Sequence, residues 1–447
     1  MKINLENAKK IKTLRGFGGS ACWWSTAVKD EKTADEIAEL LYGDSGLKLN
    51  IYRYNVGGGF EEGNVRVANP WRVIESFMNG DGSYDFSKDK NAVNMMKKCL
   101  EKGNVDTLIF FANSPHYTQL ITRQASGGLI ENFSNLRRDC YKDFAKYFID
   151  IAEHFIGEGY PVKYISPINE PQWKWGGGYV WQEGCHYSPV EMRSVFREFA
   201  RELKSRNSPL RLYGPESGNI DTNTRKYYEL LSMDKEIFEY LDAFCYHSYG
   251  SDDDVATKKK FGEWVNKYIN TPRFDMSEWC ELPCKHATDD FESALIMARV
   301  IGEDLIYTAV DSWTAWVCVN QTGELRDGKS YSDGLLYADD DFSEYHIAMR
   351  YYAMAHYSKF IPSGSESLDI GFDTEKGFSV FAFKNPDGET VLVAVNQSSS
   401  KRVIEPDVKF ESARVILSNQ AEQLKELDAN PGKIDVAPMS IATVILK

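Results

Sequence analysis

The chain lacks a long hydrophobic run, a repetitive tract and a run of basic residues. No stretch approaches the roughly 18 consecutive apolar residues that a membrane-spanning helix needs. The chain has 52 Lys and Arg against 66 Asp and Glu, so its formal net charge is −14. A chain with this charge and no basic run releases few counterions on contact with a nucleic acid, and this release is what drives such binding. We therefore expect neither a membrane nor a nucleic acid as a partner, and we expect a globular chain.

Cysteine is scarce as well, with eight residues in 447. Several lie in apolar, strand-like contexts, which favours buried thiols over a disulfide framework. The N-terminal segment contains lysines but not the apolar core of roughly 7–15 residues that a secretory signal has. As the sequence stands we expect a cytoplasmic protein, or a secreted one if a signal has been removed.

Short apolar runs alternate with longer amphipathic segments through most of the chain, a pattern typical of parallel strands joined by crossover helices. Candidate strands are Gly16–Ser20, Leu49–Tyr54, Asp106–Phe111, Lys163–Ile168, Arg211–Tyr213, Ala243–Tyr246, Phe274–Ser277 and Ser312–Trp316. Candidate helices are Thr33–Leu41, Lys88–Glu101, Leu136–Ile156, Pro189–Ser205, Lys258–Asn270, Asp290–Thr308 and Ser343–Phe360. Eight alternations predict a (β/α)₈ barrel, the TIM-barrel architecture, rather than an open sheet.

The last part of the chain changes to strand-like alternation. Four candidate strands, separated by turn residues, predict an antiparallel β-sandwich: Gly377–Lys384, Thr390–Asn396, Arg414–Ser418 and Ile441–Lys447. The leading segment Lys2–Thr13 precedes the first barrel strand and could add a strand to this sandwich. We expect a catalytic barrel over residues 14–362 and a side domain formed by residues 1–13 with residues 363–447.

Two glutamates follow candidate strands directly. Asn169 and Glu170 follow the fourth strand, and Glu278 follows the seventh. Side chains at the C-terminal ends of barrel strands face the active site. Cleavage of a glycosidic bond needs one carboxylic acid and one carboxylate, so this pair indicates a glycosidase, the alternative being a salt bridge at each strand end.

Aromatic and polar side chains gather at the same predicted strand ends. A sugar ring has an apolar face and a rim of hydroxyl groups, so such side chains suit a carbohydrate site. The candidates for substrate binding are Trp24, Tyr117, Trp173, Tyr249, Trp279 and Trp316, with Asn169, Glu216 and His247 as polar partners.

The motifs, in order and spacing, resemble those of glycoside hydrolase family 30. They are GFGGS at 16–20, RYNVGGG at 53–59, ANSP at 112–115, INEP at 168–171, GPES at 214–217, YHSY at 246–249, SEW at 277–279, SWTAW at 312–316 and YYAMAHYSKFIPSG at 351–364. The resemblance implies a retaining β-glycosidase with a (β/α)₈ barrel and an attached β-sandwich.

The resemblance also implies roles for particular residues. Glu170 would be the general acid and then the general base, and Glu278 the nucleophile. Asn169 would bond the sugar 2-hydroxyl, while Arg53 and Tyr249 would hold Glu278 ionised. Retention implies that the two carboxyl groups lie roughly 5–5.5 Å apart, against about 6.5–9.5 Å for inversion.

One loop and the residues that follow two of the candidate strands limit the choice of substrate. The loop at 170–189 is similar to the branch of the family that acts on β-1,6-linked galactan. Trp23 and Trp24 stand where glucosylceramide-cleaving members carry an acidic residue, and Val317 replaces an Asn after Trp316. We expect cleavage of β-1,6-galactan or its oligosaccharides, with a β-1,6-glucanase or β-xylosidase as alternative.

Two other interpretations remain open. A non-catalytic carbohydrate-binding protein on a barrel scaffold is one, although both carboxylates are present. The other is a structural zinc at Cys280, Cys284 and His286, but no paired CxxC accompanies them, and loop packing or a local disulfide is the better explanation. We expect no metal and no organic cofactor.

Overall fold

The eight predicted barrel strands close into a parallel barrel in chain order, and the last strand pairs back to the first. The structure is a computed structural model that describes residues 1–178, 181–269, 271–371 and 376–447. The barrel strands are β3 (Gly16–Ser20), β4 (Ile51–Asn55), β5 (Thr107–Phe111), β6 (Val162–Ser166), β7 (Arg211–Asn219), β8 (Leu241–Tyr249), β9 (Phe274–Trp279) and β10 (Ser312–Ala315). The predicted fold class is therefore confirmed.

Strands β7 and β8 are much longer than the predicted Arg211–Tyr213 and Ala243–Tyr246. Gly214-Pro215 and polar residues such as Glu216 and His247 break the apolar pattern, but parallel pairing continues through them with several register shifts. The extra length carries Glu216 and His247 into the barrel rim.

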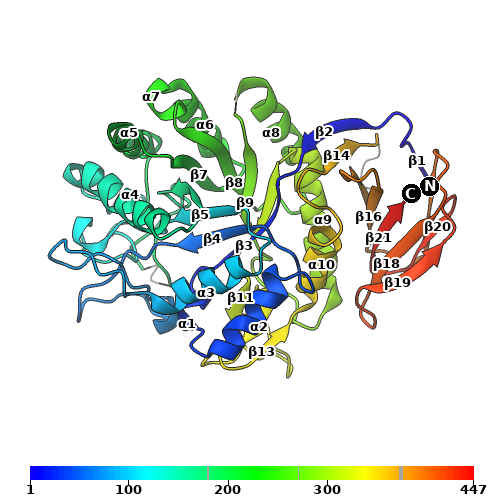
Figure 1. The fold of residues 1–447 in the computed structure, drawn as a ribbon, viewed down its shortest axis with the longest axis horizontal. Coiled ribbons are helices and arrows are strands. Elements are labelled where there is room, and N and C mark those ends of the chain that lie inside the picture. The colour runs from blue at the N-terminus through cyan, green and yellow to red at the C-terminus, as the bar shows by residue number, and fades with distance from the viewer. Residues whose placement is uncertain (179–180, 270, 372–375) are drawn as a thin grey trace.

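Helices surround the barrel (Figure 1). They are α1 (Trp24–Ala27), α2 (Glu31–Tyr42), α3 (Lys90–Glu101), α4 (Tyr141–Gly157), α5 (Pro189–Arg206), α6 (Thr222–Met233), α7 (Lys235–Phe238), α8 (Val255–Tyr268), α9 (Phe291–Glu303) and α10 (Met349–Ser358). Short helical turns occur at Pro70–Arg72, Tyr117–Gln119, Arg138–Cys140 and Asp304–Thr308.

Most helices begin where a side chain caps the first turn by accepting a hydrogen bond from a backbone N–H. Helix α5 begins with a complete capping box between Ser188 and Glu191, with Pro189 in the first turn, so its backbone N–H groups are satisfied at the start. Helix α8 begins earlier than predicted, because the Asp254 side chain accepts a hydrogen bond from the Thr257 N–H. The last residue of that prediction, Asn270, lies outside the described residues.

A two-sheet sandwich packs beside the barrel (Figure 1). The larger sheet has the strand order β19-β18-β21-β16-β15-β14-β2 and the smaller one β1-β17-β20. Their strands are β1 (Lys2–Ile3), β2 (Lys9–Thr13), β14 (Glu366–Asp369), β15 (Phe378–Lys384), β16 (Thr390–Asn396), β17 (Arg402–Pro406), β18 (Ala413–Ser418), β19 (Lys425–Ala429), β20 (Ile434–Val436) and β21 (Ser440–Leu446). The N-terminal segment joins both sheets, and its β1–β17 pairing is parallel.

The sandwich and the barrel share hydrophobic packing. Phe381 and Phe383 of β15 and Ile441 of β21 belong to the same buried cluster as the barrel helices. Gly302 of α9 lies so close to Phe381 that an added Cβ would be 2.1 Å from its ring. The opposite face of the large sheet forms a separate core with the small sheet.

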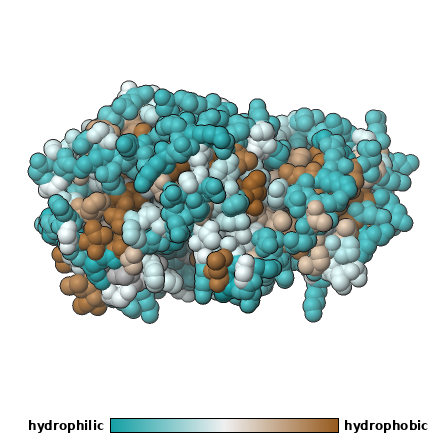
Figure 2. Space-filling view, turned by 90° about the horizontal axis from the view of Figure 1, so that it is seen from below, coloured by the Kyte–Doolittle hydropathy of each residue, from teal (hydrophilic) through white to brown (hydrophobic). Residues whose placement is uncertain are grey.

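A small third sheet follows the last barrel strand and was not predicted. It contains β11 (Val319–Gln321), β12 (Leu336–Ala338) and β13 (Tyr345–Ile347). On the face shown in Figure 2, hydrophilic residues predominate and hydrophobic ones form separate patches. Among the described residues, no helix combines the length and apolarity needed to cross a membrane.

Candidate active site

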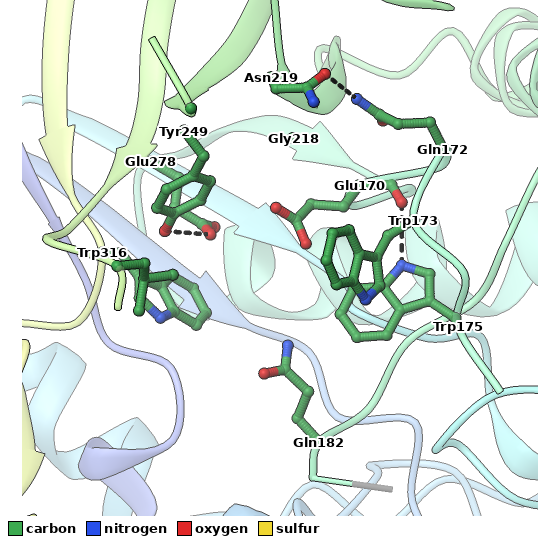
Figure 3. A pocket seen from close by; sticks show the side chains of 12 residues that line it. Glu170, Gln172, Trp173, Trp175, Gln182, Gly218, Asn219, Tyr249, Glu278 and Trp316 are labelled. Atoms are coloured by element: carbon green, nitrogen blue, oxygen red, sulfur yellow. Dashed lines mark hydrogen bonds between the residues drawn. The ribbon is translucent and has the colours of Figure 1, made fainter. Parts of the chain in front are cut away.

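A cavity of about 380 Å³ lies at the C-terminal rim of the barrel (Figure 3). Both predicted catalytic glutamates line it, together with aromatic and amide side chains. The lining residues are Glu170, Gln172, Trp173, Trp175, Gln182, Gly218, Asn219, Tyr249, Gly250, Glu278, Leu282 and Trp316.

Glu170 and Glu278 converge across this cavity. Glu170 follows β6 and Glu278 is the penultimate residue of β9. A carboxylate oxygen of each lies within 4.8 Å of the other, and Figure 3 shows Glu170 pointing toward the side of the cavity that holds Glu278. This separation fits the roughly 5–5.5 Å of retaining glycosidases and is short for a pair with an attacking water between them.

The Glu278 carboxylate is held at both oxygens. Arg53 Nη1 donates to Oε2 at 2.9 Å, and the Tyr249 hydroxyl donates to Oε1 at 3.1 Å. Burial raises the pKa of Glu278 to about 7, against the opposing effects of His247 and Arg53. Without those two cationic partners, a carboxyl group this deeply buried would be protonated over a wider pH range.

The backbone at Glu170 is held in one conformation by hydrogen bonds. Its φ of 45° is in the left-handed region, and its N–H donates to the Glu216 carbonyl at 2.8 Å. The Glu170 carbonyl in turn accepts from the Trp175 indole at 3.0 Å. On the neighbouring strand β7, an added Cβ at Gly218 would be 2.8 Å from Glu170 Oε1, so a glycine at this position leaves room for the carboxylate.

Four predicted site residues lie beneath the cavity rather than on its wall. Asn169, Arg53, Glu216 and His247 are all buried. Arg53 Nη2 donates to Asn169 Oδ1 at 2.8 Å, and Asn169 Nδ2 donates to Asn113 Oδ1 at 3.1 Å. The guanidinium also lies 3.6 Å from the centre of the Phe111 ring. This layer contacts the two glutamates from below.

His247 joins three carboxyl groups within that layer. Its Nδ1 lies 3.1 Å from Glu170 Oε1 and 3.4 Å from Glu278 Oε1, and its Nε2 lies 3.1 Å from Glu216 Oε2. Burial alone would lower the pKa of His247, but Glu278, Glu170 and Glu216 together raise it to about 9. The imidazole is therefore a cation at neutral pH.

Three of the predicted aromatic residues are not among the described residues that line the cavity. The Trp24 indole donates to the Ser20 carbonyl at 2.9 Å, and the Trp279 indole donates to Asp252 at 3.0 Å. Both rings are fully buried in the core. Tyr117 packs under Arg123, whose guanidinium lies 5.5 Å from the ring centre. Trp279 ends its strand, and Trp24 and Tyr117 follow theirs, but packing turns each ring away from the cavity.

The remaining aromatic predictions fall on the cavity wall. Trp173 is 53% exposed, whereas Trp316 is 7% exposed and meets Trp23 edge to face at 5.2 Å between ring centres. Trp173 and Trp316 lie on different sides of the Glu170 carboxylate in Figure 3. Packing therefore fixes the Trp316 side of the cavity, whereas the Trp173 side is exposed to solvent.

Sequence reasoning missed three amides on the wall. Gln172, Gln182 and Asn219 line the cavity, and Gln172 Nε2 donates to Asn219 Oδ1 at 3.3 Å. Gln172 and Gln182 belong to the same loop as Glu170, and that position alone could have suggested them. Asn219 lies on the unpredicted extension of β7, so no signal placed it at the rim.

Among the described residues, Cys280, Cys284 and His286, which were considered as zinc ligands, do not lie close enough together to hold an ion. The Cys284 thiol faces the Ser332 carbonyl at 3.4 Å, while His286 bonds to the Glu281 carboxylate. All eight cysteines lie in the described part of the chain and carry free thiols. Glu170, His247 and Glu278 are close enough to surround an ion, but hydrogen bonds among them account for the arrangement.

Comparison with known proteins identifies the family. The sequence model for O-glycosyl hydrolase family 30 matches residues 1–242, and that for the glycosyl hydrolase family 30 beta sandwich domain matches residues 364–444. The first match alone covers more than half of the chain. The chain belongs to glycoside hydrolase family 30. It is therefore a glycoside hydrolase with a carbohydrate substrate.

Individual members of family 30 are distant in sequence. An endo-β-1,6-galactanase of Hypocrea rufa is 21% identical over 422 residues, which cover 88% of this chain and 80% of the relative. The lysosomal acid glucosylceramidase of Mus musculus is 22% identical over 428 residues, covering 91% and 80%. A conserved exported protein from Bacteroides fragilis has the same fold, with a TM-score of 0.84, 22% identity and 99% of each chain covered.

Proposed function

We propose that the chain cleaves β-1,6-linked galactan or galacto-oligosaccharides with retention, by double displacement. The approach of Glu170 and Glu278 to within 4.8 Å across one cavity carries the mechanism. The similarity of the loop at 170–189 to the galactan-cleaving branch, and the Hypocrea rufa relative, support the substrate.

In the first step, Glu278 attacks the anomeric carbon while Glu170 donates its proton to the departing glycosidic oxygen. The C–O bond to the leaving sugar breaks, and a covalent glycosyl-Glu278 ester forms. In the second step, Glu170 takes a proton from water, the water oxygen attacks the same carbon, and Glu278 leaves as a carboxylate. Bonds from Arg53 and Tyr249 hold the attacking carboxylate in one orientation.

The cavity wall suits a sugar ring. Trp173 and Trp316 offer flat apolar surfaces, and the amides of Gln172, Gln182 and Asn219 provide donors and acceptors for hydroxyl groups. Because Glu170 protonates the leaving group, the half of the cavity beside Trp173 receives the departing sugar. The half between Glu278 and Trp316 then holds the sugar whose anomeric carbon reacts.

A product profile on β-1,6-galactan, β-1,6-glucan and xylan tests the substrate. We expect the highest kcat/KM on β-1,6-galactan and a newly released sugar of β configuration by ¹H NMR. Faster turnover of glucan or xylan would transfer the proposal to that polymer, and an α product would exclude retention.

Glu278→Gln tests the nucleophile. The amide is nearly isosteric but does not form the ester, so we expect a loss of about 10³-fold or more in kcat. Glu303→Gln is the matched control, because Glu303 is also fully buried and ion-paired but lies outside the cavity. Comparable turnover by Glu278→Gln and the wild type would refute the assignment.

We also propose that residues 14–362 are the catalytic unit and that residues 1–13 with 363–447 support it. The shared packing of Phe381 and Phe383 with the barrel helices favours a supporting role. Deletion of residues 365–447 should then give insoluble protein, and a soluble, fully active truncation would contradict this proposal.

A further inference from the structure

Glu216 is a buried carboxylate that the double displacement does not use. Its side chain is fully buried and it is absent from the described cavity lining. The Ser166 hydroxyl donates to Oε1 at 3.1 Å, Arg53 Nη2 lies 3.3 Å from the same oxygen, and the Ser277 hydroxyl donates to Oε2. Every contact named here comes from a donor or a cation.

These contacts fix the state of Glu216. Burial would raise the pKa of Glu216, but Arg53 and His247 outweigh that effect and lower it to about 2. Glu216 therefore carries no proton over the range in which the enzyme would work. Since Glu216 Oε2 is 3.1 Å from His247 Nε2, that nitrogen must carry the hydrogen of the bond between them.

With Nε2 protonated in every state, only Nδ1 of His247 can gain or lose a proton. This nitrogen faces Glu170 Oε1 at 3.1 Å and Glu278 Oε1 at 3.4 Å. A lone pair there would face the carboxylate oxygen of Glu278 at 3.4 Å, whereas an N–H can donate to Glu278 or to the carbonyl oxygen of a protonated Glu170. The geometry thus favours the doubly protonated imidazolium.

The charges then balance. Before the first step the buried layer holds two cations, Arg53 and His247, and two anions, Glu216 and Glu278, with Glu170 protonated. Removal of the Glu216 charge would leave one buried cation in excess, and His247 is the cation that can respond by losing a proton.

We propose that Glu216 is a positioning residue that acts through His247. By staying ionised, it keeps an imidazolium N–H between Glu170 and Glu278, and this cation favours the ionised form of the nucleophile. The inference rests on the proposed roles of Glu170 and Glu278, and it replaces the expectation that Glu216 and His247 bind substrate.

Other titratable groups around this network stay in one state. Tyr249 faces both His247 and Glu278, and the thiols of Cys22 and Cys280 lie near Glu278. Burial raises the pKa of all three well above their ordinary values, so they remain neutral. Arg53 remains a cation because the charges of Glu216 and Glu278 outweigh its burial. The charges of His247 and Glu278 are then the ones that the pH profile follows.

A titration that needs no substrate tests the first half of the proposal. In protein labelled with ¹⁵N-histidine, the His247 ring signals are assigned by their loss in His247→Gln. We expect both ring nitrogens of wild-type His247 to remain protonated above pH 7, with Nε2 protonated throughout. In Glu216→Gln the Nδ1 proton should be lost at a pH lower by about one unit or more. A neutral wild-type ring at pH 6, or an unchanged titration in the variant, would overturn the proposal.

The pH dependence of kcat/KM tests the second half. With 2,4-dinitrophenyl β-D-galactopyranoside the leaving group needs no general acid, so the acidic limb reports ionisation of Glu278. Glu216→Gln should move this limb upward by about one pH unit or more and change KM less than about threefold, because Glu216 does not face the cavity. A loss of kcat at all pH values with an unmoved limb would indicate a structural role only and overturn the proposal.

Two further variants separate charge from folding. Glu216→Asp retains the charge and should keep the acidic limb within about 0.5 unit of the wild type, even if kcat falls. Glu303→Gln removes a buried, ion-paired carboxylate elsewhere and should leave the limb in place. A limb that moves equally in Glu303→Gln would contradict the specific role of Glu216. If the wild type hydrolyses no glycoside, the proposed function fails while the histidine titration still decides the state of His247.

Discussion

Two fully buried histidines, one beneath the active site and one between the barrel and the sandwich, differ in charge. His247 lies among three carboxyl groups, which raise its pKa to about 9. Burial lowers the pKa of His356 to about 3, and its hydrogen-bonding partners are two hydroxyl groups. Depth in the protein is the same for both, so the neighbours decide which form of the ring is stable.

The hydroxyl groups around His356 specify a neutral ring. Thr443 Oγ1 donates to the His356 carbonyl at 2.9 Å, so it accepts from Nδ1 at 2.8 Å. Ser418 Oγ accepts from the Leu424 N–H at 2.9 Å and is free to donate to Nε2 at 2.8 Å. One ring nitrogen donates and the other accepts. The interface therefore uses histidine as a hydrogen-bonding bridge, whereas the active site uses it as a charge.

Arg53→Met should give the largest effect, because it removes one of the two cations that balance the carboxylates beneath the active site. We expect unfolding to require about 3–5 kcal/mol less free energy, and kcat/KM to fall about 100-fold or more because Glu278 loses a charged donor. Urea denaturation and steady-state kinetics measure the two effects. The exposed pair of Arg414 with Glu426 provides the control: Arg414→Met should change stability by less than about 1 kcal/mol. Equal effects at both positions would mean that the buried charges have no special role.

His356→Ala should separate stability from catalysis. It removes two hydrogen bonds and leaves a cavity at the barrel–sandwich interface, so we expect a loss of about 2–4 kcal/mol in unfolding free energy. The kcat of the folded fraction should stay within about twofold of the wild type, because the ring's partners Thr443 and Ser418 are not among the described residues that line the cavity. His346→Ala, at an exposed histidine, should be neutral. A large fall in kcat for His356→Ala would show that the interface is coupled to the active site.

The two histidines should also give opposite pH dependences of stability. His356 has a lowered pKa, so the unfolded chain binds the extra proton and stability is lost as pH falls from about 6.5 toward 3. His247 has a raised pKa, so its contribution is present below about 6.5 and is lost as pH rises through 9. Wild type should lose stability relative to His356→Gln by about 1.4 kcal/mol per pH unit between pH 6 and pH 4. A constant difference across this range would show that His356 does not titrate as described.

Glu183→Gln should have the smallest effect. It tests whether burial keeps a carboxyl group near the active site uncharged, as burial keeps the ring of His356 uncharged. Burial raises the pKa of Glu183 to about 8, and its Oε1 accepts from the Gly58 N–H at 3.0 Å. Stability should fall as pH rises from 4.5 to 8, because the folded state retains the proton that the unfolded chain has released. Gln should be within about 1 kcal/mol of wild type at pH 5 and relatively more stable at pH 8. Thermal unfolding at both pH values checks this, and a variant less stable at pH 8 would contradict a neutral Glu183.

The sequence predicted the barrel because burial and periodicity are local properties. Each barrel strand is an apolar run between helical segments, and parallel closure follows from their order. The same reasoning placed Glu170 and Glu278 at one rim. It ended β7 and β8 too early, since the pattern is broken by residues such as Glu216 and His247, whose burial is made possible by partners on other strands.

The direction in which a side chain points could not be predicted from the local sequence. A tryptophan at or just after the end of a strand can form a cavity wall, as Trp316 does, or fill the core, as Trp24 and Trp279 do, and the sequence pattern around it does not tell the two cases apart. What decides between them is the position of a distant acceptor, such as Asp252 for the Trp279 indole. The charge state of His247 likewise depends on three residues from three different strands or loops.

The strand order of the sandwich has a consequence for how the chain can be divided. Lys2 of β1 pairs with Glu405 of β17, and Thr13 of β2 pairs with Glu366 of β14, so both ends of the sequence are fastened to one body (Figure 1). A truncation that divides the chain once, between the barrel and the C-terminal part of the sandwich, would separate β1 and β2 from the strands with which they pair. During synthesis, β2 can pair only after some 350 further residues have been made and β1 only after some 400, so both strands are among the last to pair.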